Sequence, residues 1–308
     1  MKTVIPPLKS QGIKTKLVPL IADLLPDYSG NWIEPFLGTG VVAFNLAHNK
    51  AQLNDLNPHL INFYRDIQDG KVTPSRVKDY LVEQSDFLLN SDLGKDSYYY
   101  EVRKRFNHSP SSLDLLFLSR AGFNGMMRFS KKGHWNIPFC KKPQRFQQAY
   151  VTKIVNQVAA VTHKMKKGWV FSNGDFSSLI ENATESDLIY CDPPYYGRHT
   201  DYYNSWSEED EYRLFELLDS TRAKFIISTW HHNRFRANPM ISKLWSRYNM
   251  VTREHFYHTG ARIENRHAMT EALIMNYEPP KKPISPTDIE LQEFSIPQIK
   301  PLFELEIR

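Results

Sequence analysis

Short apolar runs bounded by polar or turn-forming residues recur along the chain, and they are typical of buried strands. They lie at 31–35, 51–55, 169–172, 188–191, 224–229 and 271–277. Segments with a helical pattern separate several of these runs. The alternation predicts an α/β fold whose mostly parallel sheet is covered by helices on both faces.

Two helices can be placed from local pattern. The apolar segment 41–47 comes directly after a glycine-rich turn and predicts a helix. A second helix begins after Ser207, whose side chain can cap it, and runs through Leu218. Asp210 stands three residues after Ser207, where it can fill the reciprocal capping role less well than a glutamate would.

The middle of the chain lacks this alternation of strands and helices. Residues 58–150 are mostly helical in pattern and become irregular and basic at 120–145. We therefore expect one α/β domain formed by 1–57 and 151–278, with 58–150 inserted into it. The Pro-rich, polar stretch 279–308 is expected to be a tail without a core of its own.

Composition narrows the class of protein. No apolar run approaches the length of about eighteen residues that a membrane helix needs, and the start lacks the apolar stretch of a secretion signal. Cys140 and Cys191 are the only cysteines and lack metal-ligand spacing, so we expect a cytoplasmic protein without structural zinc. The net charge of +5 permits binding to nucleic acid without requiring it.

A glycine-rich turn, Glu34-Pro35-Phe36-Leu37-Gly38-Thr39-Gly40, follows the first predicted strand. Glycines allow close approach of a ligand to the backbone. The turn lacks the third glycine of a dinucleotide fingerprint and the Lys-Ser/Thr of a phosphate loop. Because Glu34 would repel a phosphate, a ligand with an amino-acid end or a ribose fits this turn better.

Acids also end the next two strands. Asp55 stands where an acid in doubly wound folds accepts hydrogen bonds from ribose hydroxyls; alternatively, it caps the helix that begins at Pro58. Asp175, followed by Phe176, is placed to meet the amino group and ring face of an adenine.

The fourth strand leads into Asp192-Pro193-Pro194-Tyr195. Two prolines stiffen the backbone and remove two N–H donors, which leaves a carboxylate, carbonyl oxygens and an aromatic ring. Such a site suits a planar base whose amino group donates hydrogen bonds. The four residues could also be no more than a turn after a strand.

Together these motifs resemble the S-adenosylmethionine-dependent amino-methyltransferases, and most closely the DNA adenine methylase family of the α group. That group places its target-recognition insertion between the cofactor motif and Asp-Pro-Pro-Tyr, which is the order found here. Lys9-Ser10-Gln11-Gly12-Ile13-Lys14 matches the family's first motif, Lys-Trp-Ala-Gly-Gly-Lys, with departures at Ser10, Gln11 and Ile13. The resemblance covers roughly residues 6–277 and implies a Rossmann-like methyltransferase sheet.

The resemblance also assigns residues to the cofactor S-adenosylmethionine and to catalysis. The cofactor residues it implies are Ser10, Lys14, Glu34, Phe36, Gly38, Gly40, Asp55, Asp175, Phe176 and Asp192. The implied catalytic residues are Asp192, Pro193, Pro194 and Tyr195.

The basic segment 120–139 resembles the part of the family that contacts DNA: a loop, then a β-hairpin with a Lys-Lys-Gly turn. Arg120 and Arg128 suit phosphate or guanine contacts, and Asn124 suits base edges. Phe123 and Met126 could wedge into the base stack. The implied DNA-binding residues are Arg120, Phe123, Asn124, Met126, Arg128, Lys131, Lys132 and Asn136. An ordinary basic surface loop is the alternative.

We therefore predict methyl transfer to adenine N6 in double-stranded DNA after the base is flipped out of the helix. Tyr195 would stack on the flipped base, while Asp192 and the Pro193 carbonyl would accept the two N6 hydrogens. Three aromatic residues of the following loop could close over the base or contact DNA, although Trp206 could equally belong to the core. They are Tyr202, Tyr203 and Trp206.

Other functions remain open from sequence alone: methylation of cytosine N4, of RNA or of a protein amide, or DNA binding without catalysis. A cognate restriction endonuclease is a candidate partner, or the protein is an orphan methylase. We expect a monomer that associates with the nucleoid when bound to DNA. Four histidines could suggest a metal, but no third ligand is evident beside the adjacent pair, so no metal is expected. They are His231, His232, His255 and His258.

Overall fold

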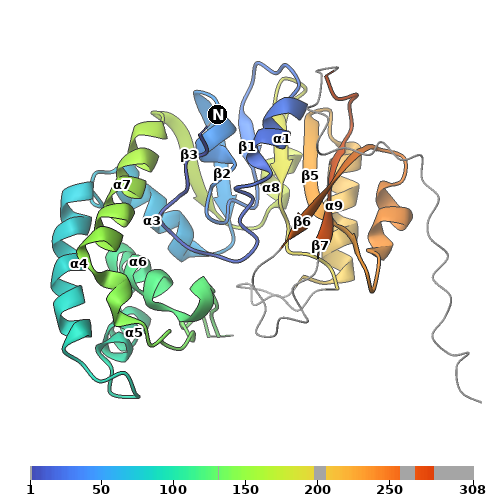
Figure 1. The fold of residues 1–308 in the computed structure, drawn as a ribbon. Coiled ribbons are helices and arrows are strands. Elements are labelled where there is room, and N and C mark those ends of the chain that lie inside the picture. The colour runs from blue at the N-terminus through green and yellow to red at the C-terminus, as the bar shows by residue number, and fades with distance from the viewer. Residues whose placement is uncertain (1, 131, 198–205, 257–267, 281–308) are drawn as a thin grey trace, which may run out of the picture.

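The computed structural model describes residues 2–130, 132–197, 206–256 and 268–280, with side chains omitted at 255, 256 and 268. Seven strands form one sheet in the order β3-β2-β1-β4-β5-β7-β6 (Figure 1). The strands are β1 (Trp32–Glu34), β2 (Lys50–Asp55), β3 (Gly168–Asn173), β4 (Leu188–Cys191), β5 (Lys224–Asn233), β6 (Asn249–Phe256) and β7 (Ala268–Met275). Strands β1 to β5 pair in parallel, and β7 is antiparallel to both of its neighbours.

The helices of the α/β part alternate with these strands. They are α1 (Val18–Leu24), α2 (Ala43–Leu46), α3 (Pro58–Gln68), α7 (Gln148–Lys164), α8 (Ser177–Glu181), α9 (Glu208–Ser220) and the π-helix η3 (Ile241–Trp245). Between α3 and α7 lie α4 (Pro74–Leu89), α5 (Tyr98–His108), α6 (Ser112–Ala121) and the 3₁₀ turns η1 (Phe123–Gly125) and η2 (Pro143–Phe146). The predicted α/β class with a Rossmann-like sheet is confirmed.

The central strands are buried on both faces, as the apolar runs predict. In β4, Leu188 and Tyr190 belong to one hydrophobic cluster, whereas Ile189 and Cys191 belong to a second cluster on the opposite face. This division follows from the two-residue period of a strand. The second cluster also holds Leu214 of α9, so helices cover both sides of the sheet.

Every predicted strand is present, but the edges of the sheet differ from the prediction. Strand β5 runs four residues beyond the predicted end at 229, because its last residues pair with β7 up to Asn233 opposite Met269. Strand β6 was not predicted. Among the described strands it pairs only with β7. It carries Arg253 and Glu254, and charged side chains are common on edge strands.

The helix starts follow their caps. Ser207 Oγ accepts from Asp210 N at 3.1 Å, and Asp210 Oδ2 accepts from Ser207 N at 2.9 Å, so the predicted reciprocal cap of α9 is confirmed. Helix α3 is capped by Asn57, whose side chain accepts from His59 N. Asp55 is therefore not the cap of this helix, and that alternative is wrong.

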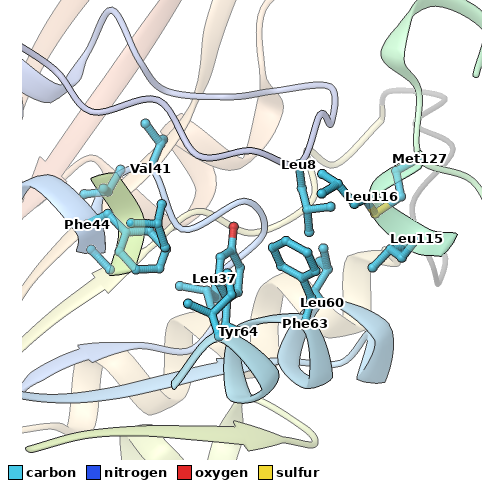
Figure 2. Packing of buried hydrophobic residues seen from close by; sticks show 14 of the residues in the cluster. Leu8, Leu37, Val41, Phe44, Leu60, Phe63, Tyr64, Leu115, Leu116 and Met127 are labelled. Carbon is cyan, nitrogen blue, oxygen red and sulfur yellow. The ribbon is translucent and has the colours of Figure 1, made fainter. Parts of the chain in front are cut away.

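One hydrophobic core joins the sheet to the helices of the middle segment (Figure 2). Leu37 of the glycine-rich turn, Phe63 of α3 and Leu116 of α6 belong to this cluster, together with Leu8 from the N-terminal segment. Because α3 also contacts β2 and β3, the segment predicted as an insertion begins with a helix that packs on the sheet. Its predicted end at 150 lies inside α7, which packs against α4.

Candidate active site

A cavity of about 250 Å³ opens at the carboxyl ends of β1, β2 and β4, where ligands bind in open α/β sheets. It is lined by all of the predicted cofactor residues except Gly40. Those lining residues are Ser10, Lys14, Glu34, Phe36, Gly38, Asp55, Asp175, Phe176 and Asp192. Pro194 lines it as well, so the first motif, the glycine-rich turn and Asp-Pro-Pro-Tyr meet in one place.

The two glycines shape the turn in different ways. Gly38 and Gly40 have φ values of +53° and +72°, a region that favours glycine. Gly38 N donates to Asp55 Oδ2 at 2.8 Å, which ties the turn to the end of β2. A Cβ on Gly40 would lie 2.6 Å from the Phe44 ring, so this glycine allows the turn to pack on α2.

Two of the carboxylates that line the cavity come from β1 and β2. Glu34 is buried, and the Trp32 indole donates to its Oε2 at 2.9 Å. Burial raises the pKa of Glu34 well above its ordinary value, although the indole bond opposes the shift. Burial also raises the pKa of Asp55 to about 6, against the bonds it accepts from Asn57 N and Gly38 N.

Three aromatic rings form another part of the cavity lining. Phe36 lies 5.1 Å from Phe176 and 5.6 Å from Trp206 between ring centroids, and all three line the cavity. The Arg213 guanidinium lies 4.5 Å from the centroid of the Phe176 ring and forms an ion pair with Asp175. Trp206 is therefore part of the pocket wall, while Tyr202 and Tyr203 lie outside the described residues.

The carboxylate of Asp192 is paired with a buried lysine. Lys14 Nζ lies 2.8 Å from Asp192 Oδ1 and also donates to the Gly12 carbonyl at 2.9 Å. Burial raises the pKa of Asp192 to about 6, Lys14 lowers it, and the nearby Glu271 raises it. Burying the pair makes the charge of each partner strongly dependent on the other.

Tyr195 is buried beside the cavity and does not line it. Its hydroxyl donates to Glu271 Oε1 at 3.1 Å, and Lys14 Nζ lies 4.9 Å from the ring centroid. Trp230 and Met269 pack with the ring. Sequence reasoning missed Glu271, although an acid at the start of the apolar run 271–277 was a usable signal.

The predicted DNA segment forms an irregular surface loop. Phe129 and Trp135 form an antiparallel bridge, and Ser130 N donates to His134 O at 2.7 Å, so the predicted hairpin pairing is present without regular strands. Arg128 Nε donates to Asn136 Oδ1 at 2.8 Å. The more exposed residues are Phe123, Asn124 and Lys132, while Met126, Arg128 and Asn136 are half-buried. Lys131 lies outside the described residues.

Arg120 does not belong to this surface, and its predicted DNA contact is wrong. The side chain is 2% exposed, and its Nε donates to the Pro7 carbonyl at 2.6 Å. It also donates to Gln157 Oε1, so it holds the N-terminal segment against α7. A guanidinium committed to these internal bonds cannot reach a phosphate.

The histidine pair lies apart from the cavity. The Nδ1 atoms of His231 and His232 are 2.7 Å apart, and burial with the charge of His232 lowers the pKa of His231 to about 4. Within the described ranges no three potential metal ligands gather at one point. The His255 side chain and His258 are not described. None of the helices in the described part combines the length and apolarity that a bilayer crossing demands.

This sheet order, with carboxylates and aromatic rings around a cavity at its carboxyl edge and Asp-Pro-Pro-Tyr beside them, defines a Rossmann-like methyltransferase. Residues 10–259 match the family described as D12 class N6 adenine-specific DNA methyltransferase, and the chain belongs to that family. The predicted family, enzyme class and adenine target in DNA are confirmed.

Curated relatives agree with this assignment. The chain is 28% identical to "Type II methyltransferase M1.LlaDCHI" of Lactococcus lactis subsp. cremoris over 290 residues, 87% of this chain and 94% of that protein. It is 32% identical to a DNA adenine methylase of Haemophilus influenzae, over 62% of this chain and 63% of the relative. It is also 28% identical to the Retron Ec67 DNA adenine methylase of Escherichia coli, over 69% and 71% respectively.

The Lys14–Asp192 pair generates a prediction about the pH dependence of methylation. Because the ionised carboxylate is the stronger acceptor, activity should fall as the pH drops through about 6. Burial raises the pKa of Asp192 and Lys14 lowers it, so Lys14→Met should raise this pKa further. The acid limb of the plot of kcat against pH should therefore move to higher pH.

The measurement is kcat against pH at saturating DNA and methyl donor. Lys16→Met, at an exposed position two residues away, is the matched control and should leave the limb in place. Asp55 titrates in the same range, but Lys14 is not among the groups that shift it. An unmoved limb in Lys14→Met would contradict the assignment to Asp192.

Proposed function

We propose that this methyltransferase uses S-adenosylmethionine to methylate N6 of an adenine flipped into the space above Asp192. The observation that carries the proposal is the position of the Asp192 carboxylate. It lines the same cavity as Glu34, Asp55 and the Phe36–Phe176 aromatic wall. Acceptor oxygens for a base amine and a pocket for a nucleoside therefore adjoin each other.

The residues present fit the cofactor. The Asp55 carboxylate suits ribose hydroxyls, and the Glu34 carboxylate suits the amino-acid end. The rings of Phe36 and Phe176 supply faces for an adenine, with Asp175 beside them as an acceptor for its amino group. When bound, S-adenosylmethionine supplies an electrophilic methyl group on a positively charged sulfur.

The target nitrogen lies inside the base stack of duplex DNA, so the base must be flipped out at a cost of a few kcal/mol. Asp192 and the Pro193 carbonyl would each accept one N6 hydrogen and turn the nitrogen lone pair out of the ring plane. Positive charge would build on N6 as the bond to the methyl carbon formed and the bond from that carbon to sulfur broke, until N6 lost one proton. The Asp192 carboxylate would stabilise that charge more than a neutral oxygen.

Tyr195 is proposed to stack on the flipped base. In this structure its ring is 6% exposed, so stacking requires a shift of side chains packed on it, among them Lys14. The hydrogen bond from the Tyr195 hydroxyl to Glu271 would hold the ring in one orientation while the other side chains shift. Stacking of this kind contributes on the order of 1–3 kcal/mol per base.

We propose that the loop 122–136 contacts the duplex beside the flipped base. Phe123 is 44% exposed and suits a wedge between bases, with half-buried Met126 beside it. Asn124 suits a base edge, and it holds φ at 54° next to Gly125. Contacts to phosphates or bases also suit three further side chains of the loop, Arg128, Lys132 and Asn136. Lys131 lies outside the described residues, and its proposed DNA contact rests on the sequence alone.

The relatives include a type II methyltransferase and DNA adenine methylases. We infer a role in restriction–modification, with a cognate endonuclease that shares the site, or as an orphan methylase. A cytoplasmic monomer that joins the nucleoid on binding DNA fits either role. Mass analysis of nucleosides from DNA treated with the enzyme separates N6-methyladenine from N4-methylcytosine. The same analysis of RNA treated with the enzyme tests the RNA alternative.

Asp192→Ala should lower the methylation rate by about a hundredfold or more, the scale of one well-placed electrostatic group. The same nucleoside analysis measures it. Since removing Asp192 leaves Lys14 buried without this partner, Asp192→Asn, which keeps the size of the side chain, is the companion variant. Near-native rates in both folded variants would reject the mechanism.

Arg128→Ala should weaken DNA binding about equally for different sequences if the guanidinium contacts a phosphate, and reduce the slope of log K against log salt by about 0.9. Fluorescence anisotropy over a salt series measures both quantities. Cofactor binding by calorimetry should be unchanged, because Arg128 does not line the cavity. An unaltered DNA affinity and salt slope would show that Arg128 does not contact DNA.

A further inference from the structure

A tight turn directly after β5 holds Arg234, Phe235 and Arg236 in a defined arrangement. Asn233 Oδ1 accepts from Phe235 N at 2.9 Å and from Arg236 N at 3.0 Å. Asn233 N donates to the Arg236 carbonyl at 2.9 Å. These three hydrogen bonds, two to the Asn233 side chain and one between backbone groups, hold the backbone of the turn in place.

The turn presents a cation and an aromatic ring to solvent. Phe235 is 63% exposed, more than the 44% of Phe123 in the proposed DNA loop. The Arg234 guanidinium lies 4.4 Å from the centroid of the Phe235 ring. A ring stacked with an arginine is a combination that suits a sugar or base face next to a phosphate.

The charge around the turn favours an anion. The stretch 231–237 reads His-His-Asn-Arg-Phe-Arg-Ala and contains no acid. Two carboxylates near the same edge of the sheet are already engaged. Glu208 pairs with Lys243, and the buried Glu271 accepts a hydrogen bond from the Tyr195 hydroxyl. Exposed Glu254 of β6 stands opposite Thr270, the residue that pairs with His232, so the two arginines of the turn face one nearby acid.

The turn is attached to the catalytic loop. Arg236 Nη1 donates to the Gly197 carbonyl at 2.8 Å, and the Trp230 indole donates to the Tyr196 carbonyl at 3.1 Å. Trp230 also packs with Tyr195 and lies 5.1 Å from the Arg236 guanidinium. The turn therefore lies beside Asp-Pro-Pro-Tyr.

The turn and the proposed DNA loop 122–136 lie toward opposite edges of the sheet. Strand β5 lies on one side of β4, whereas β1, β2 and β3 lie on the other. The helices α4, α5 and α6 gather beyond β3 (Figure 1). A duplex that delivers a base to Asp192 would thus pass between the middle segment and the end of β5.

We propose that the Asn233–Arg236 turn is a second DNA-contact surface, in which Arg234 binds a backbone phosphate and Phe235 packs on the adjacent sugar or base. It lies across the catalytic loop from the segment 122–136. The inference rests on the proposed function in one respect: the duplex must bind at the carboxyl edge of the sheet.

The test uses the full chain and a labelled duplex that contains methylatable sites. Arg234→Ala should weaken binding about three- to tenfold at low salt and reduce the salt slope by about 0.9, because one phosphate contact is lost. Phe235→Ala should weaken binding about fivefold with a smaller change of slope, since stacking releases no counterion.

Arg222→Ala is the matched control. This arginine is exposed and precedes the amino end of the same strand, so it lies at the opposite edge of the sheet. Its loss should leave affinity and slope unchanged. If Arg234→Ala and Arg222→Ala bind DNA alike, the surface is overturned.

The two proposals fail separately. If the native protein methylates adenine while Arg234→Ala retains full affinity, the second surface is wrong and the enzyme assignment stands. If the native protein leaves adenine unmodified but Arg234→Ala still loses affinity and slope, the surface stands and the proposed chemistry is wrong.

Discussion

An ion pair between the buried Lys14 and the half-buried Asp192 joins two separate segments of the cavity lining. Lys14 belongs to the N-terminal segment and Asp192 directly follows β4, and the Lys14 Nζ atom lies 2.8 Å from Asp192 Oδ1. A buried carboxylate without a partner would be strongly destabilising. The N-terminal segment therefore favours the charged form of the Asp192 carboxylate, because Lys14 lowers the pKa of that group.

The core explains how that segment is kept in place. Leu8 packs into the same hydrophobic cluster as the glycine-rich turn and α3, and Arg120 binds the Pro7 carbonyl from α6. The helices of the middle segment consequently support the cavity as well as carrying the loop 122–136, which we propose contacts DNA. A change in their packing would be transmitted to Lys14 and so to Asp192 through contiguous contacts.

Local signals predicted much of the fold and most of the pocket. The apolar runs gave β1 to β5 and β7, and the polar residues that end them line one cavity because parallel strands bring their carboxyl ends to the same edge. Strand β6 was not predicted because, at the edge of the described sheet with β7 as its neighbour, it is half-exposed and carries charged residues that interrupt an apolar run. The DNA contact predicted for Arg120 was wrong because a basic residue in a basic segment can be buried when internal acceptors bind its guanidinium.

Sequence by itself determined which chemical groups are available: an Asp-Pro-Pro-Tyr loop with few donors, a glycine-rich turn beside a glutamate, and a basic loop. Only the tertiary structure decided which of them meet. It paired Lys14 with Asp192, gave Tyr195 a partner in Glu271, and joined Arg236 to Gly197. These contacts link residues 39 or more positions apart, and no local pattern encodes them, because they depend on how separate strands and segments pack into one sheet.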